Sequence, residues 1–348
     1  MTTLVFILPF LVGYTILVVY AERKLSAFMQ DRLGPMEVGY YGLLQTVADL
    51  IKLLQKEDIV PTAAHRWLFK VAPILIFLAV FAGFAVIPLS PSWPGAGIQA
   101  GVFFLLAIIS LDVVGIVAAG WGSNNKYSSL GTLRSIAQII SYEIPMGLAV
   151  ICVCIVCGSL DLQQISTLQA AGAPNAHFLG IARLSTSGAG GFLTWNVIQA
   201  PILLVVWVIF FVASLAECNR APFDLPEAES ELVAGYHTEY SGFRFAIIML
   251  AEYAMMLLVS LLGVILFWGS WNSPLPNVGA VLLAEWTNGP IWGVFWLITK
   301  SAFMVAIQIW VRWTFPRLRI DQLLNLSWKY LTPATLILLL ICTWWKLV

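Results

Sequence analysis

The sequence predicts an all-α integral membrane protein with about eight transmembrane helices. The chain has 348 residues, of which 60% are hydrophobic and only 10% are charged, with a mean hydropathy of +0.89. A soluble domain carries about a quarter of its residues as charged side chains. No run of short alternating segments indicates a membrane β-barrel. Eight apolar stretches are long enough to cross a bilayer as helices: 4–20, 71–89, 101–120, 136–158, 197–216, 243–268, 291–311 and 328–345.

The distribution of basic residues predicts the orientation of these spans. Fourteen of the 18 Lys and Arg residues fall on or beside the connections after spans 1, 3, 5 and 7. Because basic residues are retained on the cytoplasmic side, these connections are expected inside and both termini outside. We expect one polytopic domain over 1–348, with a retained first span, in a bacterial inner membrane rather than an organellar one.

The first inside connection is predicted to contain an amphipathic helix at 39–57. Its leucines, isoleucine and valine recur at helical spacing on one face. Gln45, Asp49, Lys52 and Lys56 lie on the other face. Such a helix lies along a membrane surface or packs under a partner subunit, and the two interpretations are compatible.

The connection at 217–243 is unusually acidic. Between Glu217 and Glu239 the sequence has six acids and one base, Arg220. Crowded carboxylates beside a membrane suggest groups whose proton occupancy changes; the alternative is an ordinary solvated acidic loop. Asp224 and Glu227 have the spacing of a capping box, which predicts a short helix ending near Gly235.

Ionisable residues inside the spans are costly and need partners, water or a function. Four are found: Asp112, Glu143, Glu252 and Lys300. Pro145 cannot donate to the Ser141 carbonyl and should leave that acceptor free beside Glu143. Lys300 is a candidate partner for any of the three acids. A structural ion pair explains each acid alone, whereas a proton path explains them together with the acidic connection.

Other chemistries are disfavoured by the sequence. Cys154 and Cys157 have C-x-x-C spacing but lack a second pair, so neither a metal nor an iron–sulfur cluster is expected. The three histidines are scattered and are expected to be structural or surface groups. No phosphate loop, dinucleotide motif or basic–aromatic stripe indicates nucleotide or nucleic-acid binding.

These motifs resemble the NADH dehydrogenase subunit 1 family, whose members are membrane subunits of NADH-quinone oxidoreductase (respiratory complex I). The resemblance covers nearly the whole chain and rests on four segments: ERKLSAFMQDRLGP at 22–35, GLLQTVADLIKLLQKEDIVP at 42–61, GWGSNNKYSSLGTLRSIAQIISYEIP at 120–145, and AECNRAPFDLPEAESELVAGYHTEY at 216–240 with AEY at 251–253. It implies a membrane-arm subunit that forms the membrane end of a quinone cavity.

The resemblance also implies residue roles. It places Glu22, Arg23, Arg32, Asp49, Lys52, Arg220 and Asp224 at the quinone cavity, and Glu143, Glu217, Glu252, Glu227, Glu229 and Glu231 in charge coupling. The implied substrate is ubiquinone or menaquinone, and the resemblance implies no flavin, iron–sulfur cluster or metal in this chain. The implied partners are the peripheral-arm quinone-site and iron–sulfur subunits, small and antiporter-like membrane subunits, and lipid. Asp112 matches no family motif.

Three alternatives remain open. A homologous membrane subunit of a hydrogenase or formate hydrogenlyase would share the spans and acidic loop without binding quinone. A free-standing ion transporter should show inverted repeats or broken helix pairs. A pure membrane anchor would leave Glu143 and Glu252 without a role.

Overall fold

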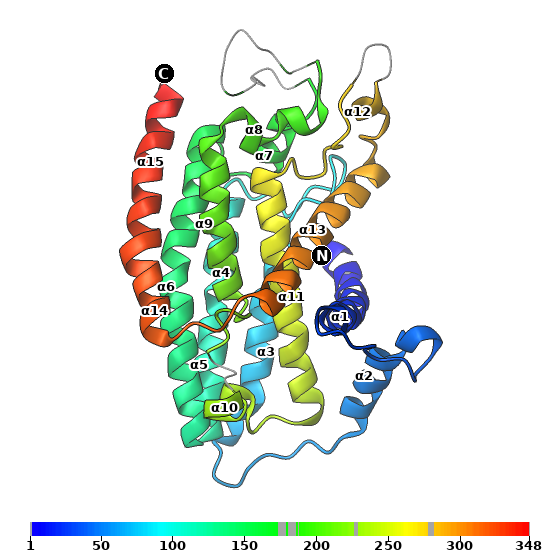
Figure 1. Cartoon of the computed structure of the whole chain (residues 1–348), viewed down its shortest axis with the longest axis vertical. Coiled ribbons are helices and arrows are strands. Elements are labelled where there is room, and N and C mark those ends of the chain that lie inside the picture. The colour runs from blue at the N-terminus through cyan, green and yellow to red at the C-terminus, as the bar shows by residue number, and fades with distance from the viewer. Residues whose placement is uncertain are drawn as a thin grey trace.

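The computed structural model describes residues 2–172, 179, 186, 188–225, 229–277 and 282–347. Over these residues it is a bundle of helices without a β-strand, as the sequence predicts (Figure 1). Seven helical segments of this described part are long and apolar enough to cross a membrane. An eighth, α9 (Ile202–Glu217), is apolar but shorter. The all-α membrane fold is therefore confirmed.

The long segments follow the predicted spans with shifted ends. They are α1 (Thr2–Met29), α3 (Arg66–Gly83), α4 (Gly101–Ile109) with α5 (Leu111–Ser123), α6 (Lys126–Cys157), α11 (Gly242–Phe267), α13 (Pro290–Thr314), and α14 (Ile320–Asn325) continuing through the π-helical η5 (Leu326–Leu331) into α15 (Thr332–Leu347). The predicted span at 197–216 is divided at Pro201, because α8 (Asn196–Gln199) precedes α9.

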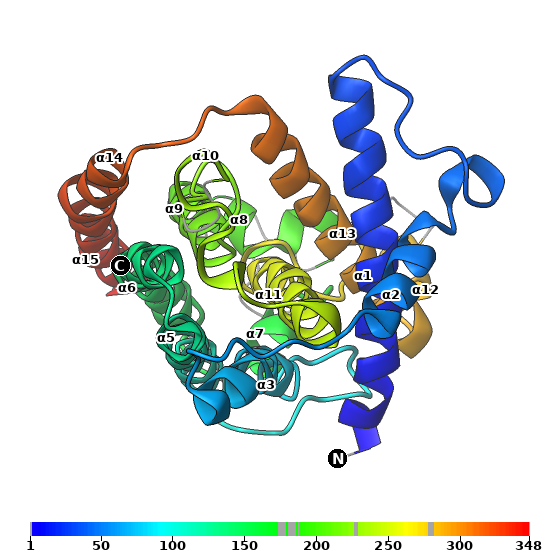
Figure 2. The ribbon, with the colours of Figure 1, turned by 90° about the horizontal axis from the view of Figure 1, so that it is seen from below.

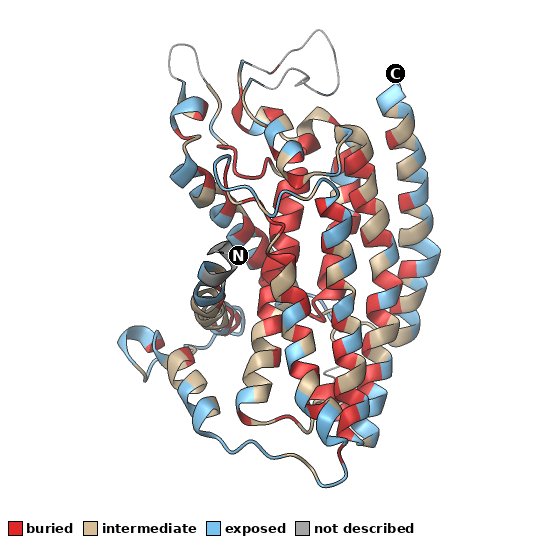
Figure 3. Ribbon diagram, turned by 180° about the vertical axis from the view of Figure 1, so that it is seen from behind, coloured by how far each residue is buried: buried red, intermediate tan, exposed pale blue. Residues whose placement is uncertain are grey.

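Helix α11 forms the centre of the bundle. It contacts α1, α2 (Gln45–Gln55), α3, α9 and α13, and two thirds of its most apolar 18-residue window is buried. Figure 3 shows buried residues concentrated in the middle of the bundle, whereas the helix at the C-terminus is mostly intermediate or exposed. Glu252 lies on α11 and is therefore held by the best-packed element of the described chain.

Helix α1 runs across the bundle rather than parallel to its axis (Figure 2). Helix α2 packs against both α1 and α11. The predicted amphipathic helix at 39–57 begins later than expected, because the separate turn η1 (Tyr40–Gly42) precedes α2. Gly42 has φ +76°, and a Cβ there would lie 2.3 Å from the Pro35 carbonyl oxygen. This close approach turns the chain before α2 can begin.

Helix α6 continues through Pro145 without a break. The Ser141 carbonyl, which Pro145 cannot reach, accepts a hydrogen bond from Ser327 Oγ at 2.5 Å. The sequence thus identified the released acceptor correctly, while its donor comes from the π-helical turn of a distant segment. Trp328 Nε1 donates to Ser141 Oγ at 3.2 Å, so the last membrane segment is fixed beside Glu143.

Candidate functional site: a lipophilic cavity with a charged inner end

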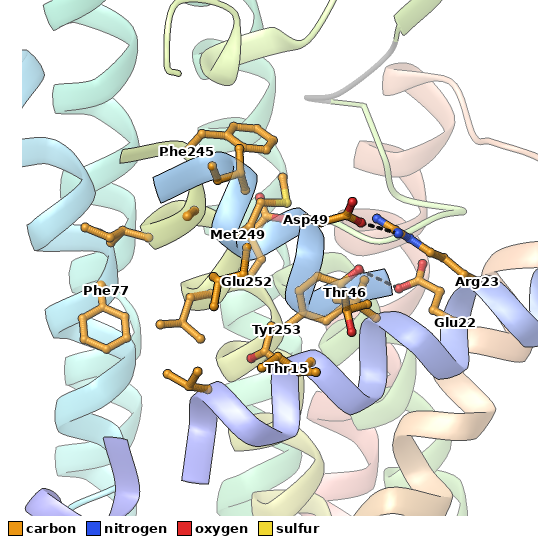
Figure 4. A pocket seen from close by; sticks show the side chains of 18 of the residues that line it. Thr15, Glu22, Arg23, Thr46, Asp49, Phe77, Phe245, Met249, Glu252 and Tyr253 are labelled. Carbon is orange, nitrogen blue, oxygen red and sulfur yellow. Dashed lines mark hydrogen bonds and ion pairs between the residues drawn. The ribbon is translucent and has the colours of Figure 1, made fainter. Parts of the chain in front are cut away.

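A cavity of about 760 Å³ lies between α1, α2, α3, α11 and α13. Its α1 wall is one helical face running from Leu8 to Ser26, which corresponds to roughly 27 Å of helix. Most of the remaining wall is apolar, and includes Leu50 and Leu53 of α2 and Phe245 and Met249 of α11 (Figure 4). The cavity is therefore shaped for a long apolar ligand with a polar group at one end.

Three buried side chains and the half-buried Arg312 converge at the charged end of this cavity. Glu22 is 7% exposed and forms ion pairs with Arg312 and, at 3.7 Å, with Arg220. The Tyr253 hydroxyl donates to Glu22 Oε2 at 2.8 Å. The Arg220 guanidinium lies 4.4 Å from the centre of the Tyr253 ring. Two arginines around one carboxylate, Arg220 buried and Arg312 half-buried, give this end a positive balance that favours an electron-rich oxygen.

A second ion pair lies in a more exposed part of the wall. Arg23 Nη1 and Asp49 Oδ2 are 2.5 Å apart, and their side chains are 44% and 35% exposed. Figure 4 shows the pair joining α1 to α2. Three other residues predicted at the cavity do not line it: Arg32 and Lys52, which are exposed, and Asp224.

Glu252 connects the cavity wall to the loop before α11. Its Oε1 accepts from the Tyr236 hydroxyl at 2.9 Å and lies 3.0 Å from His237 Nε2. Both partners belong to η4 (Gly235–His237). His237 is 4% exposed. The sequence predicted a structural or surface group, whereas His237 lies beside an acid of the cavity wall.

A polar strip on α6 holds the start of the acidic connection. Gln138 Nε2 donates to Ala216 O at 2.8 Å, Asn219 Oδ1 at 3.1 Å and Phe223 O at 2.8 Å. The Tyr142 ring packs edge-on against Phe223. Gln138 therefore fixes the chain on both sides of Arg220, at the point where it leaves α9 for the cavity.

Distant residues balance the acids of the connection. Asp224 pairs with Arg317 at 3.2 Å, and Glu231 pairs with Arg134 at 2.5 Å. Glu239 accepts a hydrogen bond from Asn125. The sequence did not indicate these partners, because they come from other connections and helices.

The predicted capping box lies partly outside the described residues, which exclude 226–228. Helix α10 covers Glu229–Leu232 within the predicted helix, and Val233 then adopts φ +66°. Asp224 forms an ion pair with Arg317. Glu227 lies outside the described residues, and so does the side chain of Glu229. The carboxyl groups of Asp224 and Glu231, both in this connection, have shifted pKa values.

Burial raises the pKa of Asp224 above its ordinary value, although Arg317 opposes the shift. The hydrogen bond and charge of Arg134 lower the pKa of Glu231. The pKa values of Asp224 and Glu231 are thus shifted in opposite directions, since Asp224 is half-buried and Glu231 is exposed beside an arginine.

Away from the cavity, Glu217 and Glu143 lie at the interface of α9 and α6. Glu217 is 3% exposed and interacts electrostatically with Glu143 and Asp112. Glu217 Oε2, Glu143 Oε1 and Asp112 Oδ1 are buried and have no hydrogen-bond partner within the described residues. Each such oxygen is satisfied by a proton or a water molecule, or it carries a substantial desolvation cost.

Lys300 has a different role from the one expected. Its ammonium donates to the carbonyls of Trp268, Ser270 and Asn272, at 2.9, 3.0 and 2.7 Å, and lies over the Trp195 ring. Lys300 thus satisfies the carbonyls that follow α11, where helices leave acceptors unpaired. It forms no ion pair with the three acids in the described structure.

The sequence reasoning missed Arg312, Tyr253, Tyr236 and His237 as site residues. Tyr236, His237 and Tyr253 do fall within the segments that carried the family resemblance. Arg312 lies 290 positions from Glu22, so no local pattern could indicate their contact. Within the described residues, no cluster of three or more His, Cys, Asp and Glu could hold a metal ion.

Known proteins are closely similar to this chain. The family model described as NADH dehydrogenase matches residues 1–343. An NADH-quinone oxidoreductase subunit of Cytophaga hutchinsonii is 56% identical, with 99% of this chain and 98% of the relative covered. The corresponding subunit is 53% identical in Chlorobium luteolum, covering 94% and 84% of the two chains, and 45% identical in Polaromonas naphthalenivorans, covering 93% and 84%. This extent of similarity means that the chain belongs to the NADH dehydrogenase family.

Proposed function

We propose that this chain is a membrane subunit of a proton-translocating NADH-quinone oxidoreductase, and that its cavity admits the quinone. The observation that carries the proposal is the cavity of about 760 Å³ with an apolar wall along α1 and a Glu22–Arg220–Arg312–Tyr253 cluster at its charged end. A quinone has matching chemistry, since its isoprenoid tail is apolar and its two carbonyl oxygens accept hydrogen bonds. The names of the relatives include the same substrate class.

In this proposal the chain lies in a bacterial inner membrane with α2 and the acidic connection on the cytoplasmic side and both termini outside. The basic residues of the inside connections support that orientation. Peripheral iron–sulfur subunits would dock there and supply electrons, and antiporter-like membrane subunits would receive the coupling signal. Reduction of the quinone by two electrons takes up two protons and gives the quinol.

The coupling is assigned to the acids around the cavity. Glu252 forms part of the wall and contacts His237, so a change of charge on the quinone alters the stability of that pair. Glu217 and Glu143 lie beyond it and interact with each other. Carboxyl groups that interact in this way titrate as a group, so a change at one site redistributes protons among the others. Asp224, Glu227, Glu229 and Glu231 would respond on the cytoplasmic side.

The cavity assignment can be tested by filling it. Ile16 lines the cavity, whereas the neighbouring Leu17 does not and is 60% exposed. Ile16→Trp should lower NADH-driven quinone reduction while NADH oxidation by a soluble artificial acceptor continues, and Leu17→Trp should leave both unchanged. Equal quinone reduction in the two variants would exclude this cavity as the quinone path.

The coupling assignment requires a separate experiment. Glu217→Gln and Glu143→Gln should lower quinone reduction or the protons translocated per NADH, while the complex still assembles. Unchanged proton translocation in both variants would remove their assigned role. Identification of the subunits that copurify with the chain distinguishes a quinone reductase from a hydrogenase, which would contain a nickel–iron subunit.

A further inference from the structure

Asp112 is a buried acid that no sequence motif explains. It lies in the first turn of α5, directly after the interruption at Ser110 that separates α5 from α4. Asp112 is 9% exposed, and its Oδ1 has no hydrogen-bond partner in the described part of the chain. A carboxyl group that only helped packing would be expected to have both oxygens hydrogen-bonded. The free oxygen therefore indicates a proton or a water molecule at this position.

Asp112 interacts with acids of two other helices. It interacts electrostatically with Glu252 of α11 and with Glu217 at the end of α9. The Cys218 thiol also interacts with these three acids. The segment that holds the partners of Glu252, η4, packs against both α5 and α6. Asp112 thus lies at the junction of the cavity wall and the Glu217–Glu143 pair.

We propose that Asp112 is a further coupling carboxyl group, which links Glu252 at the cavity to Glu217 and Glu143 in the interior of the bundle. This inference rests on the proposed function and extends it to a residue outside the family's recognisable motifs. The unpartnered oxygens of Asp112, Glu217 and Glu143 give the three groups a matching need for protons or bridging water. Glu252 differs, because Tyr236 and His237 already contact it.

The chemical step is a proton transfer between carboxyl groups. A protonated carboxyl breaks its O–H bond as a bridging water accepts the proton, and that water passes a proton to the next carboxylate, where a new O–H bond forms. No oxidant or reductant is consumed in this step. A change of charge at Glu252 would alter the proton affinity of Asp112 and, through it, that of Glu217.

The test compares Asp112→Asn with Asp112→Glu in the intact complex in sealed membrane vesicles. The control is Asp161→Asn, because Asp161 caps α7 (Leu162–Leu168) and an asparagine retains that cap. Asp112→Asn should lower the rate of NADH-driven proton translocation by about tenfold or more, in the range of a lost proton-transfer group. Asp112→Glu should restore much of the rate, and Asp161→Asn should match the wild type.

Infrared difference spectra recorded on quinone reduction give a readout that a structural role would not change. A carboxyl band that disappears in Asp112→Asn and shifts in Asp112→Glu supports the proposal. If Asp112→Asn does not assemble, the comparison of wild type with Asp112→Glu decides, and identical spectra overturn the inference.

The Glu217→Gln variant distinguishes a failure of the Asp112 inference from a failure of the proposed function. Impaired translocation in Glu217→Gln with normal translocation in Asp112→Asn would overturn the role of Asp112 and leave the proposed function intact. Normal translocation in both variants would overturn the Asp112 inference together with the coupling assignment. A double variant that is no worse than either single variant would show that the two carboxyl groups act as one unit.

Discussion

Replacing Glu22 by glutamine should destabilise the chain far more than replacing Asp49, a more exposed carboxylate of the same cavity, by asparagine. Gln retains the shape of Glu22 and can still accept from Tyr253, but it leaves Arg220 and Arg312 without their shared negative charge. The Glu22 and Arg220 side chains are each 9% exposed. Breaking a buried ion pair on one side costs about 3–5 kcal/mol, since the remaining charge stays desolvated.

Asp49→Asn is the matched comparison because it removes one carboxylate from the same cavity. The Arg23–Asp49 pair is 44% and 35% exposed, and an exposed pair contributes about 0.2–1 kcal/mol. The assay is the midpoint of thermal inactivation of quinone reduction by the complex in native membranes, recorded with the amount of assembled complex. Equal midpoint shifts for the two variants would refute the reasoning that burial controls the cost.

A double variant tests whether the cost arises from unbalanced charge. Glu22→Gln combined with Arg312→Gln removes one acid and one base from the cluster, so it should be less destabilised than the sum of the two single variants. Groups in direct contact show interaction energies of about 0.5–3 kcal/mol. Strict additivity would mean that Glu22 and Arg312 do not stabilise each other, whatever their distance.

Three further predictions follow from local geometry. Gly131→Ala on α6 would place a Cβ 2.7 Å from Gly235 Cα and should displace η4, lowering quinone reduction, whereas Gly147→Ala on the same helix meets nothing within 4 Å and should leave activity unchanged. Lys300→Met should lower the thermal midpoint, because each of three buried acceptors that loses its donor costs about 1–3 kcal/mol, while the protons translocated per NADH should stay constant. Burial raises the pKa of Asp224 from its ordinary value of 3.8. Its contribution to stability is therefore complete below pH 3.8 and is lost as the pH rises through the higher pKa of the folded state. Asp224→Asn should flatten that part of the profile of thermal midpoint against pH, and an unaltered profile would contradict the assignment.

The apolar spans were predictable because hydropathy and helical spacing are local properties. α6 and α11 lie where the sequence placed them, and the carbonyl freed by Pro145 was identified before its donor was known. The helix ends were less predictable. α1 continues past its apolar stretch through Glu22 and Arg23 to Met29, because tertiary contacts satisfy charges that hydropathy alone would assign to a loop.

The charge balance of the acidic connection could not be predicted from its own sequence. Arg134 is 97 positions from Glu231, and Arg317 is 93 positions from Asp224. Ion pairs at such separations depend on how the helices pack, which a linear count of acids and bases does not contain. The same applies to Lys300, whose plausible acidic partners were all within the spans, while its actual acceptors are backbone carbonyls after α11.

These contacts change how the acids should be interpreted. An acid that has an arginine partner, such as Glu231, holds a stable charge and anchors one segment to another. An acid such as Glu217 or Asp112 has a buried oxygen without a hydrogen-bond partner in the described residues, and so lacks such an anchor. Under the proposed function, the paired acids hold segments together and the unpartnered acids carry the proton transfer. Glu252 differs from both groups, because its partner His237 is charged only when its ring is protonated.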